Sequence, residues 1–137
     1  MSHRTLIVQP ASAPLRGTAH LPGDKSISHR VALFGALAGG ITTAEGWLPA
    51  EDCLATLRVL RALGVPIEQE GTSLRVEGAG LRGLRAPSAP LDCGGSGTTM
   101  GLLSGVLAGQ SFDSTLTGND ALRRRPMGRI TRPLRRM

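Results

Sequence analysis

The chain has 137 residues, a net charge of +6, 40% hydrophobic and only 2% aromatic residues, so it can bury one ordinary aliphatic core and is not wholly disordered. No apolar run is long enough to span a bilayer, and the N-terminal MSHRTLIVQP has no hydrophobic signal core. We therefore expect a cytoplasmic protein with no membrane partner.

The first part of the chain is predicted to alternate extended segments and helices. Residues 5–8 are expected to form a short strand that ends at Pro10, and residues 17–21 a second extended segment. The turn PGDKS then opens a helix that Gly39-Gly40 stops. Its apolar residues recur at helical spacing, at Ile27, Val31, Phe34 and Ala38.

A strand over residues 41–47 follows, and a second helix starts near Pro49 and stops at Gly64. The apolar positions of that helix are Leu54, Leu57, Leu60 and Leu63. Period-two alternation on both sides of Gly71 predicts a hairpin over residues 65–77.

The pattern then restarts at a spacing of roughly 72 residues, which indicates an internal repeat. A loop at residues 87–90 leads to the glycine-rich DCGGSGTTM, a helix, a strand over residues 112–116 and a last helix after Pro126. The predicted fold class is therefore α/β (α+β), with repeated strand-helix-strand-helix-strand-strand units. The second unit is expected to be truncated.

Cys53 and Cys93 are isolated from each other in sequence and have no CxxC spacing. We predict two buried free thiols, with a disulfide or a zinc site as the less favoured alternative. His3, His20 and His29 form no ligand cluster with them, so no metal site is expected.

Both glycine-rich turns lead into a helix N-terminus, where free backbone N–H groups and the helix dipole favour anions. In the first turn Lys25 adds a charge and Ser26 a hydroxyl, and Arg30 lies on the same helical face as Ser26. Helix capping by Asp24 or Ser26 is the alternative, although it does not account for Lys25 and Arg30 together. In the second turn the glycines allow a ligand to approach the backbone, with simple flexibility as the alternative.

Seven arginines lie within residues 123–137. Such a run is typical of a nucleic-acid-binding arm, and a basic nucleic-acid-binding module is the alternative function. Aromatic residues for base stacking are absent there, however, and an apolar helical stripe predicts a packed helix with a basic face. The stripe consists of Met127, Ile130, Leu134 and Met137. We expect Arg125, beside Pro126, to face a ligand, with a solvated charge run as the alternative.

Three segments together resemble one family, the 3-phosphoshikimate 1-carboxyvinyltransferases (EPSP synthases). LPGDKSISHR is similar to the family's lysine signature, DCGGSGTTMGLLSG to its glycine-rich segment and LTGNDALRRRPMGRITRPLRRM to its arginine segment. Their order and spacing also match. The resemblance implies the enolpyruvyl transferase fold, in which the first strand belongs to a second domain. We expect three parts. Residues 1–15 contain the strand of the other domain, residues 16–80 form the first repeat unit, and residues 81–137 form an incomplete second repeat unit of the same domain.

The resemblance also implies a reaction, in which the enolpyruvyl group of phosphoenolpyruvate is transferred to the 5-hydroxyl of shikimate 3-phosphate and phosphate is released. This is a step toward chorismate and the aromatic amino acids. No cofactor or nucleic-acid partner is implied, and the full-length enzyme would be a monomer. The implied roles are Lys25 against both substrates, Ser26, Arg30 and Thr98 on the shikimate side, and Gly97 and Arg125 on the phosphoenolpyruvate side.

The chain departs from the family pattern at two positions. Gly95 stands where the family usually has Asn, and Gly101 where it usually has Arg. The family's acid–base carboxylates would also lie beyond Met137. We therefore expect this chain by itself to be inactive.

Overall fold

The computed structural model describes residues 5–137, which form one three-stranded sheet, one two-stranded sheet and five helices. The elements in chain order are α1 (Lys25–Leu37), β1 (Gly39–Ala44), α2 (Glu51–Ala62), β2 (Ile67–Glu70), β3 (Ser73–Ala79), β4 (Leu91–Asp92), α3 (Gly97–Ala108), β5 (Leu116–Thr117), α4 (Asp120–Arg123) and α5 (Gly128–Leu134). The predicted mixed α/β class is confirmed. The helices α1 and α3 also begin at the predicted repeat spacing.

The larger sheet is antiparallel, with β3 between β1 and β2. Gly71 has a φ of +53° and forms the turn between β2 and β3, so the predicted hairpin is confirmed. Gly78 in β3 lies against the end of α1, because a Cβ atom there would come within 2.1 Å of the Ala38 carbonyl oxygen. A glycine is therefore required where the strand crosses the helix end.

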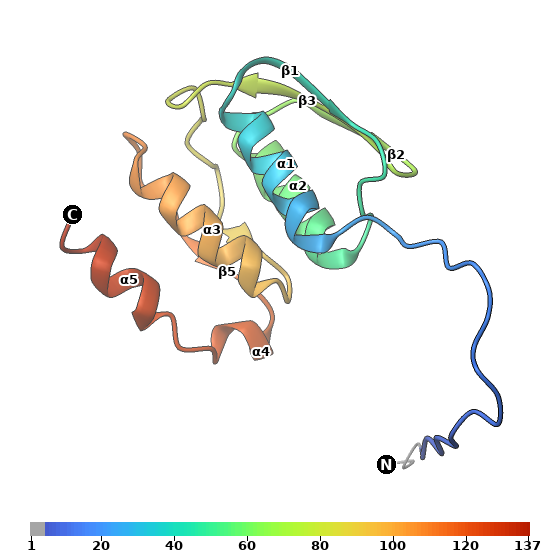
Figure 1. Cartoon of the computed structure of the whole chain (residues 1–137). Coiled ribbons are helices and arrows are strands. Elements are labelled where there is room, and N and C mark those ends of the chain that lie inside the picture. The colour runs from blue at the N-terminus through green and yellow to red at the C-terminus, as the bar shows by residue number, and fades with distance from the viewer. Residues whose placement is uncertain (1–4) are drawn as a thin grey trace.

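The core is aliphatic and centres on α2, which contacts both α1 and α3. Its Leu57, Leu60 and the following Leu63 are completely buried, as their helical spacing predicts. Leu74 and Val76 lie two residues apart on β3 and are also buried, since alternate residues of a strand point to one face. Figure 1 shows the three-stranded sheet running alongside α1 and α2, with α3 on the opposite side of this helix pair.

The predicted strand at residues 5–8 is wrong, and residues 17–21 form no paired strand either. Residues 5–24 contain neither helix nor strand, and most of this segment extends away from the rest of the chain (Figure 1). A strand must satisfy its backbone N–H and C=O groups against a partner, and no described strand pairs with this segment. Residues 1–4 of the expected 1–15 segment lie outside the described residues.

The second half of the chain differs from prediction at one strand. The strand expected over residues 112–116 is displaced to β5, which pairs in parallel with β4. Within residues 5–137 no helix combines the length and the apolar character needed to cross a membrane.

Candidate anion-binding site

The first glycine-containing turn is capped by Asp24. Its Oδ1 accepts a hydrogen bond of 2.7 Å from the backbone N–H of Ile27, so the capping explanation holds for this residue. Ser26 is left exposed on the first turn of α1. The Arg30 side chain folds back along the helix, and its Nη1 donates to the Ser26 carbonyl oxygen at 3.1 Å. Ser26 and Arg30 therefore lie on one face, as their spacing predicts.

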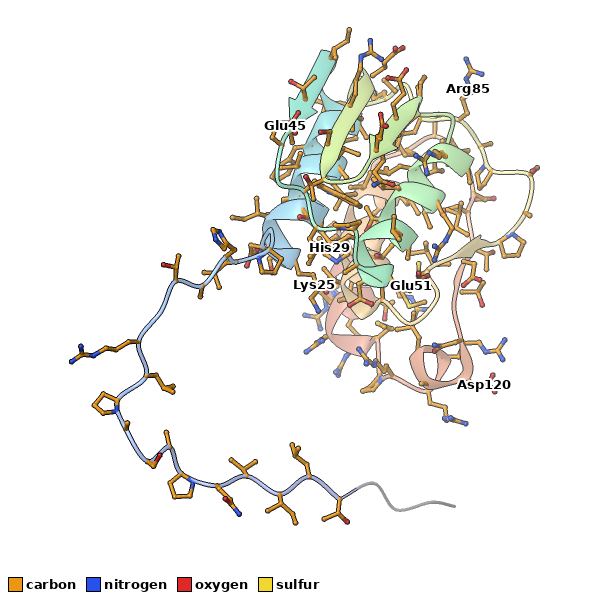
Figure 2. The ribbon with its side chains drawn as sticks, turned by 90° about the vertical axis from the view of Figure 1, so that its right-hand side faces the viewer. Lys25, His29, Glu45, Glu51, Arg85 and Asp120 are labelled. Carbon is orange, nitrogen blue, oxygen red and sulfur yellow. The ribbon has the colours of Figure 1, made fainter. Side chains whose placement is uncertain are left out.

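Lys25 lies next to the start of α2. Its Nζ is 3.2 Å from the Asp52 Oδ2, and the two side chains are 52% and 37% exposed. An exposed ion pair of this kind contributes little to stability, so the amine can leave Asp52 for an anionic ligand at small cost. Figure 2 shows Lys25 and Glu51, the residue before Asp52, at the same end of the molecule. The contact with Asp52 was not predicted, because the two residues belong to different helices.

The glycine-rich turn is held in place by hydrogen bonds. Gly94 has a φ of +57°, its N–H donates to the Asp92 Oδ1 at 2.8 Å, and its carbonyl oxygen accepts from the Asn119 N–H at 2.8 Å. Ser96 caps α3, because its Oγ accepts from the Thr99 N–H at 3.1 Å. These contacts favour a fixed turn over a flexible one. They also leave the backbone of Gly97 at the very start of the helix.

Arg125 lies directly over Gly97. A Cβ atom on Gly97 would be only 2.7 Å from the Arg125 Nη1, so the guanidinium occupies the space that a side chain would fill. A hollow of about 750 Å³ adjoins this contact. Its lining includes Gly97, Thr98, Gly101, Arg125, Arg129 and Arg132. A helix N-terminus and three arginines thus line one space, and such a site favours a phosphate or a carboxylate.

The helix α5 closes one side of this hollow by packing on α3. Ile130 lies so near Gly101 that its Cδ1 would be 3.1 Å from an added Cβ. A long side chain at position 101 would have to displace Ile130, which gives a physical reason for glycine there. The apolar stripe is only partly buried: Ile130 and Leu134 are half-buried, and Met137 is fully exposed.

The two turns meet at the start of α2 through Asp52. Its carboxylate holds Lys25 of the first turn, and its backbone oxygen accepts from the Thr99 hydroxyl at 3.2 Å. The predicted site residues therefore form two neighbouring groups, Lys25 with Ser26 and Arg30 on α1, and Gly97 with Thr98 and Arg125 beside α3. Asp52 and Thr99 connect the groups and were not predicted.

The cysteines are buried free thiols, as predicted. Burial raises the pKa of Cys93 to about 11, and burial also raises the pKa of Cys53. Among residues 5–137 no group of three or more His, Cys, Asp or Glu side chains is arranged to hold a metal ion. His3 lies outside the described residues.

Fold and site together define a mixed α/β protein in which two related turns open onto helix N-termini beside a lysine and several arginines. The family model for EPSP synthase (3-phosphoshikimate 1-carboxyvinyltransferase) matches residues 10–137. The chain is 59% identical over 125 residues to a 3-phosphoshikimate 1-carboxyvinyltransferase of Methylococcus capsulatus, covering 90% of this chain and 28% of the relative. It is 50% identical over 137 residues to that of Shouchella clausii, covering 100% of this chain and 32% of the relative.

The fold is similar to a solved EPSP synthase structure from Acinetobacter baumannii, with a TM-score of 0.85 and 50% sequence identity. That match covers 88% of this chain and 27% of the solved one. The chain therefore belongs to the EPSP synthase family, as its three segments predicted. It spans about a third of the length of the curated relatives it matches.

Proposed function

We propose that this chain forms part of the substrate-binding surface of an enolpyruvyl transferase that acts on phosphoenolpyruvate and shikimate 3-phosphate. The observation that supports this most directly is the Arg125 guanidinium over Gly97, 2.7 Å from where a Cβ would lie. A cation beside a helix N-terminus favours binding of a phosphate or carboxylate group, and both substrates have both groups.

In this proposal Arg125 and the backbone at Gly97 bind phosphoenolpyruvate. Ser26, Arg30 and Thr98 bind shikimate 3-phosphate. Lys25 leaves Asp52, contacts both substrates and stabilises the negative charge of their anionic groups. The methylene carbon of phosphoenolpyruvate takes up a proton, and the 5-hydroxyl oxygen adds to the adjacent carbon and loses its own proton. The tetrahedral intermediate then loses phosphate and a proton of the new methyl group, and the product is an enolpyruvyl ether.

The proposal is tested by an NMR titration of the isotopically labelled chain with shikimate 3-phosphate, with shikimate and inorganic phosphate as control ligands. We expect saturable shifts of the amides of Lys25, Ser26, Arg30 and Thr98 with the phosphorylated ligand only. Lys25→Met is expected to abolish them. Arg16→Met is the matched control, since it removes the same charge from the segment that extends away from both turns.

Absence of specific shifts in a folded wild-type chain would contradict the proposed binding role. Salt-dependent binding to unrelated oligonucleotides that survives Lys25→Met would instead favour the basic nucleic-acid-binding module.

A further inference from the structure

A chain of buried polar groups crosses the core from α1 to α3. The His29 Nδ1 is 2.7 Å from the Thr56 Oγ1 on α2, which is 2.8 Å from the Thr99 Oγ1 on α3. Thr99 in turn is 2.8 Å from the Ser96 Oγ, the side chain that caps α3. His29, Thr56 and Thr99 are 0% exposed and Ser96 is 1% exposed. These contacts therefore operate in a region without solvent, where hydrogen bonds are strong.

The donor of each hydrogen bond in this buried row can be assigned by starting at Thr99. The single hydroxyl proton of Thr99 is directed at the Ser96 Oγ and at the Asp52 carbonyl oxygen, 3.2 Å away, which can only accept. Thr99 cannot also donate to Thr56, so Thr56 donates to Thr99. The hydroxyl proton of Thr56 is then used, and the His29 Nδ1 must supply the proton of the next bond. The neutral imidazole is therefore protonated at Nδ1 and unprotonated at Nε2.

The His29 Nε2 is buried and has no hydrogen-bond partner among the described residues. Protonation of this atom would place a buried N–H without an acceptor. Burial accordingly lowers the pKa of His29, and Lys25 and Arg30 of the same helix act in the same direction, whereas Asp52 of α2 opposes them. The helix α3 contains no charged residue. His29 thus stays neutral, and its Nδ1–H fixes which group donates in each of these buried hydrogen bonds.

Packing alone does not account for a histidine at this position. An apolar side chain would fill the same space without leaving an unpaired polar atom, whose burial is unfavourable. The two ends of the hydrogen-bond chain give a better reason for a histidine at position 29. One end lies on α1, four residues after Lys25, and the other is the Ser96 cap that begins α3 at Gly97. Thr99 also holds the backbone of Asp52, whose carboxylate pairs with Lys25.

We infer that His29 is a positioning residue, whose Nδ1–H directs a buried hydrogen-bond chain through Thr56 and Thr99 to the Ser96 cap and so fixes the glycine-rich turn relative to the turn of Lys25. The consequence for ligand affinity rests on the proposed function. The placement of the two turns does not depend on the proposed function, since it is a property of the protein without ligand.

The first test is spectroscopic and needs no ligand. Long-range ¹H–¹⁵N spectra of the imidazoles in the labelled chain are expected to show His29 protonated at Nδ1 and bare at Nε2. Thr56→Val keeps the shape of the side chain and removes the hydroxyl, so it should shift the amides of Ser96, Gly97 and Thr98, although residue 56 is on another helix. Ser104→Ala is the control, because the Ser104 hydroxyl bonds only within α3, to the Met100 carbonyl oxygen at 2.7 Å.

The second test uses substitutions of His29 itself. His29→Asn retains an N–H that can donate to Thr56, and should restore the amide shifts of Gly97 and Thr98 that His29→Leu changes. Affinity for shikimate 3-phosphate should fall roughly tenfold in His29→Leu and in Thr56→Val, and recover in His29→Asn.

A His29 protonated only at Nε2 would overturn the inference. So would a Thr56→Val chain that melts at a lower temperature but keeps the wild-type amide shifts at Gly97 and Thr98, since that pattern is expected of a merely stabilising contact. If His29→Leu does not fold, Thr56→Val alone decides. If the wild-type chain does not bind shikimate 3-phosphate, the proposed function fails while the tautomer and the amide shifts still decide this inference.

Discussion

Gly97 leaves the space that the Arg125 guanidinium occupies at the start of α3. We expect Gly97→Ala to weaken phosphoenolpyruvate binding on the order of tenfold, because the new Cβ, 2.7 Å from the Nη1, must push the guanidinium away from the helix N-terminus. The measurement is a phosphoenolpyruvate titration followed by amide shifts or calorimetry. Unchanged affinity would show that the guanidinium does not bind this ligand from its present position.

Gly105 provides the matched control for that substitution. It lies in the same helix, and an added Cβ there would meet nothing within 4 Å. Gly105→Ala should therefore leave ligand affinity unchanged and raise stability by up to about 1 kcal/mol, since alanine is the better helix former.

Cys93 predicts a pH dependence of stability. Burial raises the pKa of its thiol from 9.0 to about 11. The folded chain holds this proton more tightly than the unfolded chain, so the resulting stabilisation is complete below pH 9 and is lost as the pH rises towards about 11. We expect the stability advantage of the wild type over Cys93→Ala to shrink between about pH 9 and about pH 11 in urea unfolding experiments.

Val59→Ala is the control for the cysteine experiment, because it truncates another buried side chain, 2% exposed, that does not titrate. Its stability difference from the wild type should not depend on pH. A Cys93→Ala difference that is equally constant would mean that the thiol does not retain its proton in the folded chain.

Among the described helices, α1, α3 and α4 each begin at a capping side chain. Asp24 accepts from the Ile27 N–H at 2.7 Å and fixes the first residue of α1 at Lys25. We expect Asp24→Ala to lower the free energy of unfolding by about 1 kcal/mol, and Asp24→Asn, which can still cap, to lower it much less. Urea unfolding of the two variants measures this. Equal losses would mean that the negative charge near the helix N-terminus stabilises the turn, and the cap does not.

Helix starts and the hairpin were predictable from sequence because their signals are local. A capping residue at the start of α1 and a glycine at Gly71 are each recognisable within a few residues of chain. The apolar period predicted the buried face of α2 but was wrong for α1, where Ile27 is 62% and Phe34 67% exposed. The strand expected at residues 5–8 failed because a strand also needs a partner, which sequence periodicity cannot supply. The strand expected at 112–116 was displaced to β5 for the same reason: its position is set by pairing with β4.

The candidate site was predictable only in part. Lys25, Arg30 and Arg125 stand out by their charge beside a turn, and the structure places each of them at a helix N-terminus or beside one. Asp52 and His29 were missed as connecting residues. Their contacts with Lys25 and Thr56 join residues 27 positions apart in sequence, and an isolated sequence contains no measure of that proximity.

On the scale of the whole molecule, the site faces solvent. Lys25, Ser26, Arg30, Thr98 and Arg125 are all exposed. Enolpyruvyl transfer passes through a charged, water-sensitive intermediate, and enzymes exclude water from such steps by closing the site. In the described part of the chain, the only carboxylate paired with Lys25 is that of Asp52. The surface around these residues is therefore open to water as well as to anionic ligands.

We accordingly expect the 137-residue chain to bind shikimate 3-phosphate without forming an enolpyruvyl product. Incubation with both substrates, followed by ³¹P NMR for released phosphate and by mass spectrometry for the enolpyruvyl ether, measures this. A full-length 3-phosphoshikimate 1-carboxyvinyltransferase is the positive control for both readouts. Product formation that disappears in Lys25→Met would mean that the surface around Lys25 completes the reaction while open to water. That outcome would assign the proton transfers to a group of this chain, with the Asp52 carboxylate beside Lys25 as the first to replace.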